Sequence, residues 1–179
     1  MQTANHKLQT TNRIYILGMM GAGKTTQGKK IAQLLGYKFI DLDKEIEKHF
    51  DKSISKIFEE DGEELFRKTE SEIVQSIQNE KVVIATGGGT PCYYNNMQYI
   101  NEHGVSIYLK AKAGLILQRI TRYPHKRPLL KGLNNDEIRA FIEQKIAERE
   151  PIYMLSDYVF EIPATSVEII VKSVLTENS

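Results

Sequence analysis

Residues 18–25 read Gly18-Met19-Met20-Gly21-Ala22-Gly23-Lys24-Thr25; an apolar run at 13–17 precedes them, and an amphipathic segment at 24–35 follows. The spacing G-x-x-x-x-G-K-[ST] is that of a phosphate-binding P-loop. Its glycines let the backbone turn so that successive N–H groups can point at phosphate oxygens, and the following helix adds the positive end of its dipole. A glycine-rich turn that carries Lys-Thr by chance is the alternative. The strand before and the helix after favour a nucleotide site.

Two side chains of this loop carry the chemistry that a bound nucleotide needs. The Lys24 ammonium can reach the β- and γ-phosphates, and the Thr25 hydroxyl can ligate Mg²⁺. We therefore expect a nucleotide and Mg²⁺ at this loop.

The composition is that of an ordinary soluble globular protein with one substantial core. The chain has 179 residues, of which 41% are hydrophobic and 26% are charged. Lys and Arg number 24 against 23 Asp and Glu, so the formal net charge is +1. This balance gives no reason to expect binding to nucleic acid or to an anionic membrane, so any anion site must be built from local clusters.

The cysteine content and the first residues indicate the compartment. Cys92 is the only cysteine, which excludes an intramolecular disulfide and fits a reducing cytoplasm. No apolar run approaches the length of a transmembrane helix, and residues 1–12 are polar and lack the apolar segment of a signal peptide. We expect residues 1–12 to be a disordered tail and the protein to be cytoplasmic.

Short apolar runs alternate with helical patterns, which predicts an α/β fold with a parallel sheet. The expected strands are 13–17, 37–40, 82–85, 105–109 and 158–162, and the expected helices are 24–35, 44–50, 53–60, 63–78, 114–120, 136–149 and 167–175. The helix at 136–149 should end before Pro151, because proline disfavours a helical conformation in the residue before it. The expected inward-facing residues include Ile31, Leu34, Leu35, Leu65, Phe66, Thr69, Ile73 and Ile77.

The long connection at 121–135 is a candidate lid. It contains two prolines and four cations, and a connection of this length in a compact domain is often functional. Arg127 stands before the apolar run Pro128-Leu129-Leu130, which would anchor it. A lid cation over a γ-phosphate is usual in phosphoryl transfer, and a solvated charged loop is the alternative.

Three features fall at the carboxyl ends of predicted strands, where open α/β sheets bind their ligands. They are the P-loop, the pair Asp41 and Asp43, and the run Gly87-Gly88-Gly89. The third strand ends in Thr86 and glycines rather than in the Asp that holds Mg²⁺ in many P-loop enzymes, so Asp41 is the candidate metal carboxylate. If the strand persists, Asp43 lies on the same side and reaches a substrate hydroxyl. Capping of the helix at 44–50 is the alternative role of Asp43.

Arg67 and Arg149 are candidates for binding an anionic substrate, but composition does not choose between that role and a structural one. Arg67 and Glu70 are three apart on a predicted helix, as in an ordinary surface ion pair. Arg149 stands at a helix end, where a solvated cation is favourable. Two arginines that fork onto one carboxylate would instead form an anion site.

Together these motifs make the chain resemble the shikimate kinase family, in the nucleoside-monophosphate-kinase-like group of P-loop folds. The resemblance runs from Arg13 to the final helix. It rests on the P-loop, D-x-D at 41–43, F-R-x-x-E at 66–70, G-G-G at 87–89, R-P-L-L at 127–130 and R-x-x-x-Y at 149–153. Each short motif after the P-loop is weak alone, whereas their order and spacing together are specific.

The resemblance implies a fold, a reaction and a set of site residues. The implied fold is one P-loop kinase domain at 13–179, with three layers (α/β/α) around a five-stranded parallel sheet, a substrate-binding helical region near 44–78 and a lid near 121–135. The implied reaction transfers the γ-phosphoryl of ATP to the 3-hydroxyl of shikimate, a step of chorismate and aromatic amino-acid biosynthesis. The implied phosphate cradle is Gly21, Ala22, Gly23, Lys24, Thr25 and Thr26. The implied shikimate site is Asp43, Arg67, Gly88, Gly89 and Arg149.

The resemblance also assigns roles. Asp43 would orient the 3-hydroxyl and accept its proton, and the two arginines of the shikimate site would clamp the carboxylate. Lys24 and Arg127 would stabilise the transferring phosphoryl, with Mg²⁺ on Thr25 and on Asp41 through water.

Three positions depart from the family pattern. The adenine-stacking lid arginine of the family lies seven residues before the R-P-L-L arginine, where this chain has Ile120, so Arg119 takes that assignment. Leu42 replaces a small polar residue and should point away from its acidic neighbours. Asp157 stands where alanine is common, and the sequence gives it no role.

Two other functions stay open. A related small-molecule kinase, such as a gluconate kinase, shares the P-loop but gives no reason for two carboxylate-clamping arginines. A catalytically silent P-loop domain that binds nucleotide as a regulator or interaction module would not need the intact catalytic set. We expect a monomer that acts on small molecules and binds neither nucleic acid nor a membrane.

Overall fold

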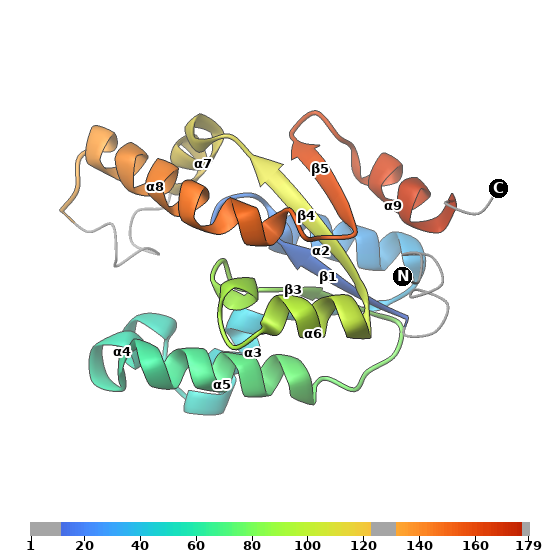
Figure 1. The fold of residues 1–179 in the computed structure, drawn as a ribbon, viewed down its shortest axis with the longest axis horizontal. Helices are drawn as coiled ribbons and strands as arrows, with labels where there is room; N and C mark the ends of the chain where they lie inside the picture. The colour runs from blue at the N-terminus through green and yellow to red at the C-terminus, as the bar shows by residue number, and fades with distance from the viewer. Residues whose placement is uncertain (1–11, 123–131, 177–179) are drawn as a thin grey trace.

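The structure is a computed structural model that describes residues 12–122 and 132–176. Its strands are β1 (Arg13–Leu17), β2 (Lys38–Asp41), β3 (Val82–Ala85), β4 (Val105–Ala111) and β5 (Tyr158–Ile162). Its helices are α2 (Lys24–Leu35), α3 (Leu42–Phe50), α4 (Ile54–Glu60), α5 (Gly62–Ser76), the 3-10 turn η1 (Thr90–Cys92), α6 (Asn96–His103), α7 (Ala113–Ile120), α8 (Asn135–Tyr153) and α9 (Val167–Thr176). Figure 1 shows α3, α4 and α5 grouped on one side of the strands and α7 and α8 on another.

Within the described residues, the five strands form one parallel sheet in the order β2-β3-β1-β4-β5. β1 is central, and its residue Ile14 lies opposite Val83 of β3 and Val105 of β4. Because all strands run in the same direction, the P-loop after β1, the end of β2 and the loop after β3 meet at one edge of the sheet. The predicted α/β/α fold with a five-stranded parallel sheet is confirmed.

The residues of β1 alternate between two hydrophobic cores, one on each face of the sheet. Ile14 and Ile16 pack in the core that includes residues of α2 and α9. Tyr15 and Leu17 pack in the core that includes residues of α5 and α6. Successive strand residues point to opposite faces, so an unbroken apolar run is what a strand covered on both faces requires.

One helical segment is absent from the sequence prediction. The structure has η1 and α6 between β3 and β4, where the sequence analysis predicts no helix. α6 spans eight residues, and its buried apolar side chains are Met97 and Ile100. Two apolar positions in so short a segment give almost no helical periodicity, which explains the omission.

The prediction that a helix ends before Pro151 is wrong, since α8 includes Pro151 and runs to Tyr153. A proline inside a helix removes a hydrogen bond and costs about 3 kcal/mol. Here the proline lies in the last turn, and Tyr153 after it is fully buried and donates a hydrogen bond to the Gly88 carbonyl. This packing offsets the cost of the proline.

Two leucines that were expected to face the core are exposed instead: Leu34 is 54% exposed and Leu65 is 44% exposed. In α2 the buried residues are Gly28, Ile31 and Ala32, and Leu34 lies outside this buried face. In α5 the buried face is centred on Phe66 and Glu70. Leu65 lies about 100° round the helix from Phe66, so it points away.

Some predicted segments lie outside the described residues. These are residues 1–11 of the predicted tail and residues 123–131 of the predicted lid, which include Arg127. Among the helices of residues 12–122 and 132–176, none is long and apolar enough to cross a bilayer.

Candidate active site

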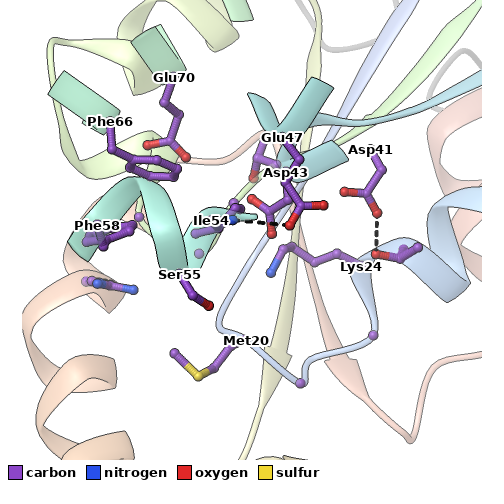
Figure 2. A pocket seen from close by; sticks show the side chains of 18 of the residues that line it. Met20, Lys24, Asp41, Asp43, Glu47, Ile54, Ser55, Phe58, Phe66 and Glu70 are labelled. Atoms are coloured by element: carbon purple, nitrogen blue, oxygen red, sulfur yellow. Dashed lines mark hydrogen bonds between the residues drawn. The ribbon is translucent and has the colours of Figure 1, made fainter. Parts of the chain in front are cut away.

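A pocket lies at the edge of the sheet where the P-loop, the end of β2 and the loop after β3 meet. Helices α3, α4 and α5 contribute much of its lining, and α7 and α8 contribute one arginine each. Figure 2 shows Lys24, Asp41 and Asp43 on one side of the pocket and Phe66 and Glu70 on the other. Charged groups from distant parts of the sequence therefore face one space.

The P-loop turns as tightly as its sequence predicts. Gly18 has a φ of 134°, and a Cβ atom there would lie 2.7 Å from the Leu109 carbonyl oxygen, so only glycine fits. Gly23 is the N-cap of α2 and also has a positive φ, of 103°. The Lys24 ammonium donates to the carbonyl oxygens of Gly18, at 2.8 Å, and Met19, at 3.1 Å. Lys24 is thereby held along the inside of the loop.

Thr25 and Asp41 meet directly. The Thr25 hydroxyl donates to Oδ2 of Asp41 at 2.8 Å, which joins the start of α2 to the end of β2. A hydroxyl and a carboxylate are hard oxygen donors of the kind that Mg²⁺ prefers. The two residues therefore fit a magnesium ion beside the P-loop.

Asp43 lies in the pocket, but on a helix rather than on a strand. β2 ends at Asp41, and α3 begins at Leu42, so the argument that both aspartates project from one strand is wrong. Capping by Asp43 is also wrong, because the N-cap position is Asp41 and Asp43 lies in the first turn. Leu42 is fully buried and points away from the pocket, as predicted. The positive end of the α3 dipole favours a carboxylate at Asp43.

Arg67 and Glu70 form a buried pair, so an ordinary surface pair is excluded. Nη1 of Arg67 lies 2.8 Å from Oε2 of Glu70, which is fully buried. The other oxygen, Oε1, accepts a 2.5 Å hydrogen bond from the Thr90 hydroxyl. Burial raises the pKa of Glu70, while the charge of Arg67 opposes that rise. One oxygen of Glu70 therefore holds Arg67, and the other holds Thr90 in the segment after β3.

The three consecutive glycines after β3 each approach a different charged residue. A Cβ atom on Gly87 would lie 2.9 Å from Oδ1 of Asp43. A Cβ atom on Gly88 would lie 3.5 Å from Nη1 of Arg149, and one on Gly89 would lie 2.6 Å from Nη1 of Arg67. The run therefore draws Asp43 and the two arginines around one backbone segment. The sequence patterns alone indicated only a strand-end feature, whereas the family resemblance implied that Gly88 and Gly89 belong to the same site as these residues.

Arg149 and Tyr153 lie on one face of α8 because they are four residues apart. The Tyr153 hydroxyl donates to the Gly88 carbonyl, and Arg149 Nη1 lies beside the same glycine. Burial raises the pKa of Tyr153, so its hydroxyl stays protonated and remains a donor. The R-x-x-x-Y motif thus holds the end of α8 against the pocket, and Arg149 lines the pocket.

Arg119 lies against the P-loop backbone. Its Nη1 atom donates to the carbonyl oxygens of Gly21, at 3.0 Å, and Ala22, at 2.9 Å, and the residue lines the pocket. Ile120 is buried, with 4% of its surface exposed. Ala22 is fully buried and does not line the pocket, and its backbone N–H donates to the Met19 carbonyl oxygen at 3.1 Å. Thr26 lines the pocket.

Several pocket residues carry no assignment in the sequence analysis. Besides Glu70 and Gly87, they include Glu47, Ser55 and Phe58. Glu47 accepts a 3.2 Å hydrogen bond from the Ile54 backbone and so joins α3 to α4. Glu70 could have been assigned to the site from the sequence, because it is the last residue of the F-R-x-x-E motif.

The comparisons with known proteins agree with this geometry. A family model described as shikimate kinase matches residues 20–178. The shikimate kinase of Parabacteroides distasonis is 43% identical over 150 residues, which cover 83% of this chain and 87% of that protein. A solved structure of shikimate kinase from Acinetobacter baumannii in complex with shikimate has a TM-score of 0.83 and 33% identity, and covers 96% of this chain and 94% of that chain.

A more distant structure shows only the shared fold. A gluconokinase from Sinorhizobium meliloti has a TM-score of 0.53 at 15% identity, over 92% of this chain and 90% of that chain.

Proposed function

The chain belongs to the shikimate kinase family, and we propose that its pocket transfers the γ-phosphoryl of ATP to the 3-hydroxyl of shikimate. The products are shikimate 3-phosphate and ADP, in a step of chorismate and aromatic amino-acid biosynthesis. The observation that carries the proposal is the run Gly87-Gly88-Gly89, against which Asp43, Arg149 and Arg67 lie in turn. One segment thereby gathers a proton acceptor and two carboxylate-binding cations beside the P-loop.

The nucleotide side of the site consists of the P-loop and Arg119. Backbone N–H groups of residues 21–26 would hold the phosphates, and the Lys24 ammonium, already on the inner side of the loop, would pair with the β- and γ-phosphates. Arg119 is suited to the adenine because its guanidinium is fixed on the P-loop carbonyls. Arg127 stays a predicted lid cation.

Kinases of this family are ATP-using enzymes, and Mg²⁺ is the metal that the donor set favours. Thr25 would hold it through its hydroxyl, and Asp41 through a water molecule, since Mg²⁺ retains several of its waters. When bound, the ion neutralises charge on the β- and γ-phosphates.

The acceptor side binds a carboxylate and orients a hydroxyl. Arg67 and Arg149 would fork onto the carboxylate of shikimate, because guanidinium groups match its two oxygens. The backbone N–H groups of Gly88 and Gly89 lie beside them. Asp43 would accept a hydrogen bond from the 3-hydroxyl. A ligand with one carboxylate and a distant hydroxyl is what this arrangement selects.

The reaction itself needs little covalent help from the protein. The 3-hydroxyl oxygen forms a bond to the γ-phosphorus as the bond from that phosphorus to the β,γ-bridging oxygen breaks. The hydroxyl proton passes to the Asp43 carboxylate and then to solvent, and ADP leaves with the bridging oxygen. Because the transition state is loose, Asp43 orients the hydroxyl and accepts its proton late, while Lys24 stabilises the transferring charge.

We propose in addition a monomer in the cytoplasm that acts on small molecules. The single cysteine and the formal net charge of +1 support this proposal.

A coupled ADP-release assay with Mg-ATP tests the proposal, with shikimate, quinate, gluconate and nucleoside monophosphates offered separately. We expect turnover with shikimate alone. Turnover with gluconate in its place would support a related small-molecule kinase. Tight ATP binding without turnover on any acceptor would support a silent P-loop domain. Either result would overturn the proposal.

A further inference from the structure

Tyr93 packs against the Arg67 guanidinium from outside the pocket. Among the described residues, three aromatic rings lie near Arg67 Cζ, with centroids at 4.5 Å for Tyr93, 5.0 Å for Phe66 and 5.8 Å for Phe58. Phe58 and Phe66 belong to the pocket lining, whereas Tyr93 does not. The ring nearest to the Arg67 guanidinium is therefore the one that does not line the pocket.

The Tyr93 hydroxyl also meets one of the carboxylates that hold Arg67. Oε1 of Glu63 accepts hydrogen bonds from Nε of Arg67, at 3.2 Å, and from the Tyr93 hydroxyl, at 3.4 Å. The Glu63 side chain is 55% exposed, so the tyrosine limits where this carboxylate can lie. Among the described residues, the hydrogen bonds of Arg67 use Nε and Nη1 and leave Nη2 for an incoming carboxylate.

The backbone of Tyr93 is anchored although its side chain is 36% exposed. Tyr93 follows η1 directly, and the Asn96 side chain after it donates to the Thr90 carbonyl oxygen at 2.9 Å. Asn96 in turn accepts a 2.7 Å hydrogen bond from the Ser71 hydroxyl of α5. The segment that begins with the glycine run is therefore fixed to α5 on both sides of Tyr93.

We propose that Tyr93 is a positioning residue for the acceptor: its ring holds the Arg67 guanidinium in the orientation that receives a carboxylate, and its hydroxyl makes a smaller contribution through Glu63. This inference rests on the proposed function, because it requires Arg67 to bind the shikimate carboxylate. Loss of one cation–π contact at a partly exposed site corresponds to about a three- to tenfold loss of affinity. The loss should fall on the acceptor and leave ATP binding unchanged.

Steady-state kinetics of Tyr93 variants, alone and combined with Arg67→Ala, test this inference. Tyr93→Ala should raise the KM for shikimate about three- to tenfold, with kcat and the KM for ATP within about twofold of the parent. Tyr93→Phe keeps the ring and should stay within about twofold, whereas Tyr93→Leu keeps apolar bulk without a π face and should behave like Tyr93→Ala. Tyr94→Ala is the matched control, because Tyr94 is the next residue and is 52% exposed.

The double variant shows whether the effect passes through Arg67. In the Arg67→Ala background, adding Tyr93→Ala should change the KM for shikimate by less than about twofold, because the contact is already lost. A full additional effect in that background, or an equal effect of Tyr94→Ala, would overturn the inference. So would an unchanged KM in Tyr93→Ala while Arg67→Ala raises it. If Arg67→Ala itself has no effect, the carboxylate clamp of the proposed function fails first.

Discussion

The Thr25 hydroxyl donates a 2.8 Å hydrogen bond to Oδ2 of Asp41. Thr25 lies at the start of α2 and Asp41 at the end of β2, so two oxygen donors that are sixteen residues apart meet beside the P-loop. In the proposed function, this contact supplies the carboxylate that many P-loop enzymes carry after the third strand, where this chain has Thr86. The carboxylate comes from the adjacent strand of the sheet instead.

Removing one of these oxygens should weaken the binding of Mg²⁺ by the enzyme in a measurable way. Thr25→Ala should raise the free Mg²⁺ concentration for half-maximal activity at least about tenfold, because a direct oxygen donor is lost. Thr25→Ser keeps the hydroxyl and should restore the Mg²⁺ dependence of the parent. The measurement is initial rate against free Mg²⁺ at saturating ATP and shikimate. Identical curves for all three proteins would exclude Thr25 as a metal ligand.

Loss of Arg67 should act on the acceptor and spare the nucleotide. A charge-assisted hydrogen bond is worth about 1.5–3 kcal/mol, so Arg67→Ala should raise the KM for shikimate about ten- to a hundredfold. Arg67→Lys keeps the charge but not the fork, and should recover only part of that loss. The KM for ATP should change by less than about twofold. Equal effects on both substrates would argue against a carboxylate clamp.

Two glycine-to-alanine substitutions should have opposite effects on stability. At Gly87 a Cβ atom would lie 2.6 Å from Oε1 of Glu70, which Arg67 and Thr90 hold in place. Gly87→Ala should therefore lower the free energy of unfolding by about 1–3 kcal/mol through overpacking. At Gly114, the second residue of α7, nothing lies within 4 Å, so Gly114→Ala should stabilise the protein by about 0.4–1 kcal/mol.

Urea unfolding of the parent and of both variants measures these differences. Activity should fall in Gly87→Ala, because Asp43 also borders this glycine, and should be unchanged in Gly114→Ala. Equal stability of the two variants would show that the contact at Gly87 relaxes without cost.

Tyr15 predicts how stability depends on alkaline pH. Burial raises its pKa to about 12, with Tyr99 adding to the rise and Arg13 opposing it. Between pH 10 and pH 12 the unfolded chain loses this proton while the folded protein keeps it, so rising pH favours the unfolded state. The contribution of Tyr15 to the free energy of unfolding is intact below pH 10. Above pH 10 this free energy falls by about 1.4 kcal/mol per pH unit.

The variant Tyr15→Phe isolates this contribution, since the other tyrosines are common to both proteins. The free energy of unfolding, measured in urea from pH 8 to pH 11, should fall less steeply above pH 10 in Tyr15→Phe than in the parent. Parallel curves would show that Tyr15 does not titrate differently in the two states.

Local sequence patterns were sufficient for the sheet and the nucleotide end of the site. An apolar run followed by glycines and Lys-Thr specifies β1, the P-loop and the start of α2, because all its determinants lie within a few residues. The alternation of strands with helices predicts that the strands run parallel to one another. The prediction that a helix ends before Pro151 was wrong because it used only the local effect of proline. The burial of Tyr153, which the local sequence does not show, extends α8 past Pro151.

The acceptor end depends on contacts between distant residues, which local patterns do not contain. The sequence patterns left Arg67 as either a surface residue or a site residue. The structure decides for a buried position, because Glu70 accepts hydrogen bonds from both Arg67 and Thr90. Asp157 had no role in the sequence, yet its Oδ2 accepts a 2.9 Å hydrogen bond from the Ser106 backbone, 51 residues away. It joins the starts of β4 and β5, which is a structural role.

The central claim is that Asp43 orients the acceptor hydroxyl and takes its proton, and its most direct test is Asp43→Asn. The amide is nearly isosteric and still accepts a hydrogen bond, so the Kd for shikimate, measured by calorimetry, should change no more than about threefold. Single-turnover phosphorylation should slow at least about a hundredfold, because a positioned base contributes this much to proton transfer. A single-turnover rate within about threefold of the parent, with binding intact, would contradict the account.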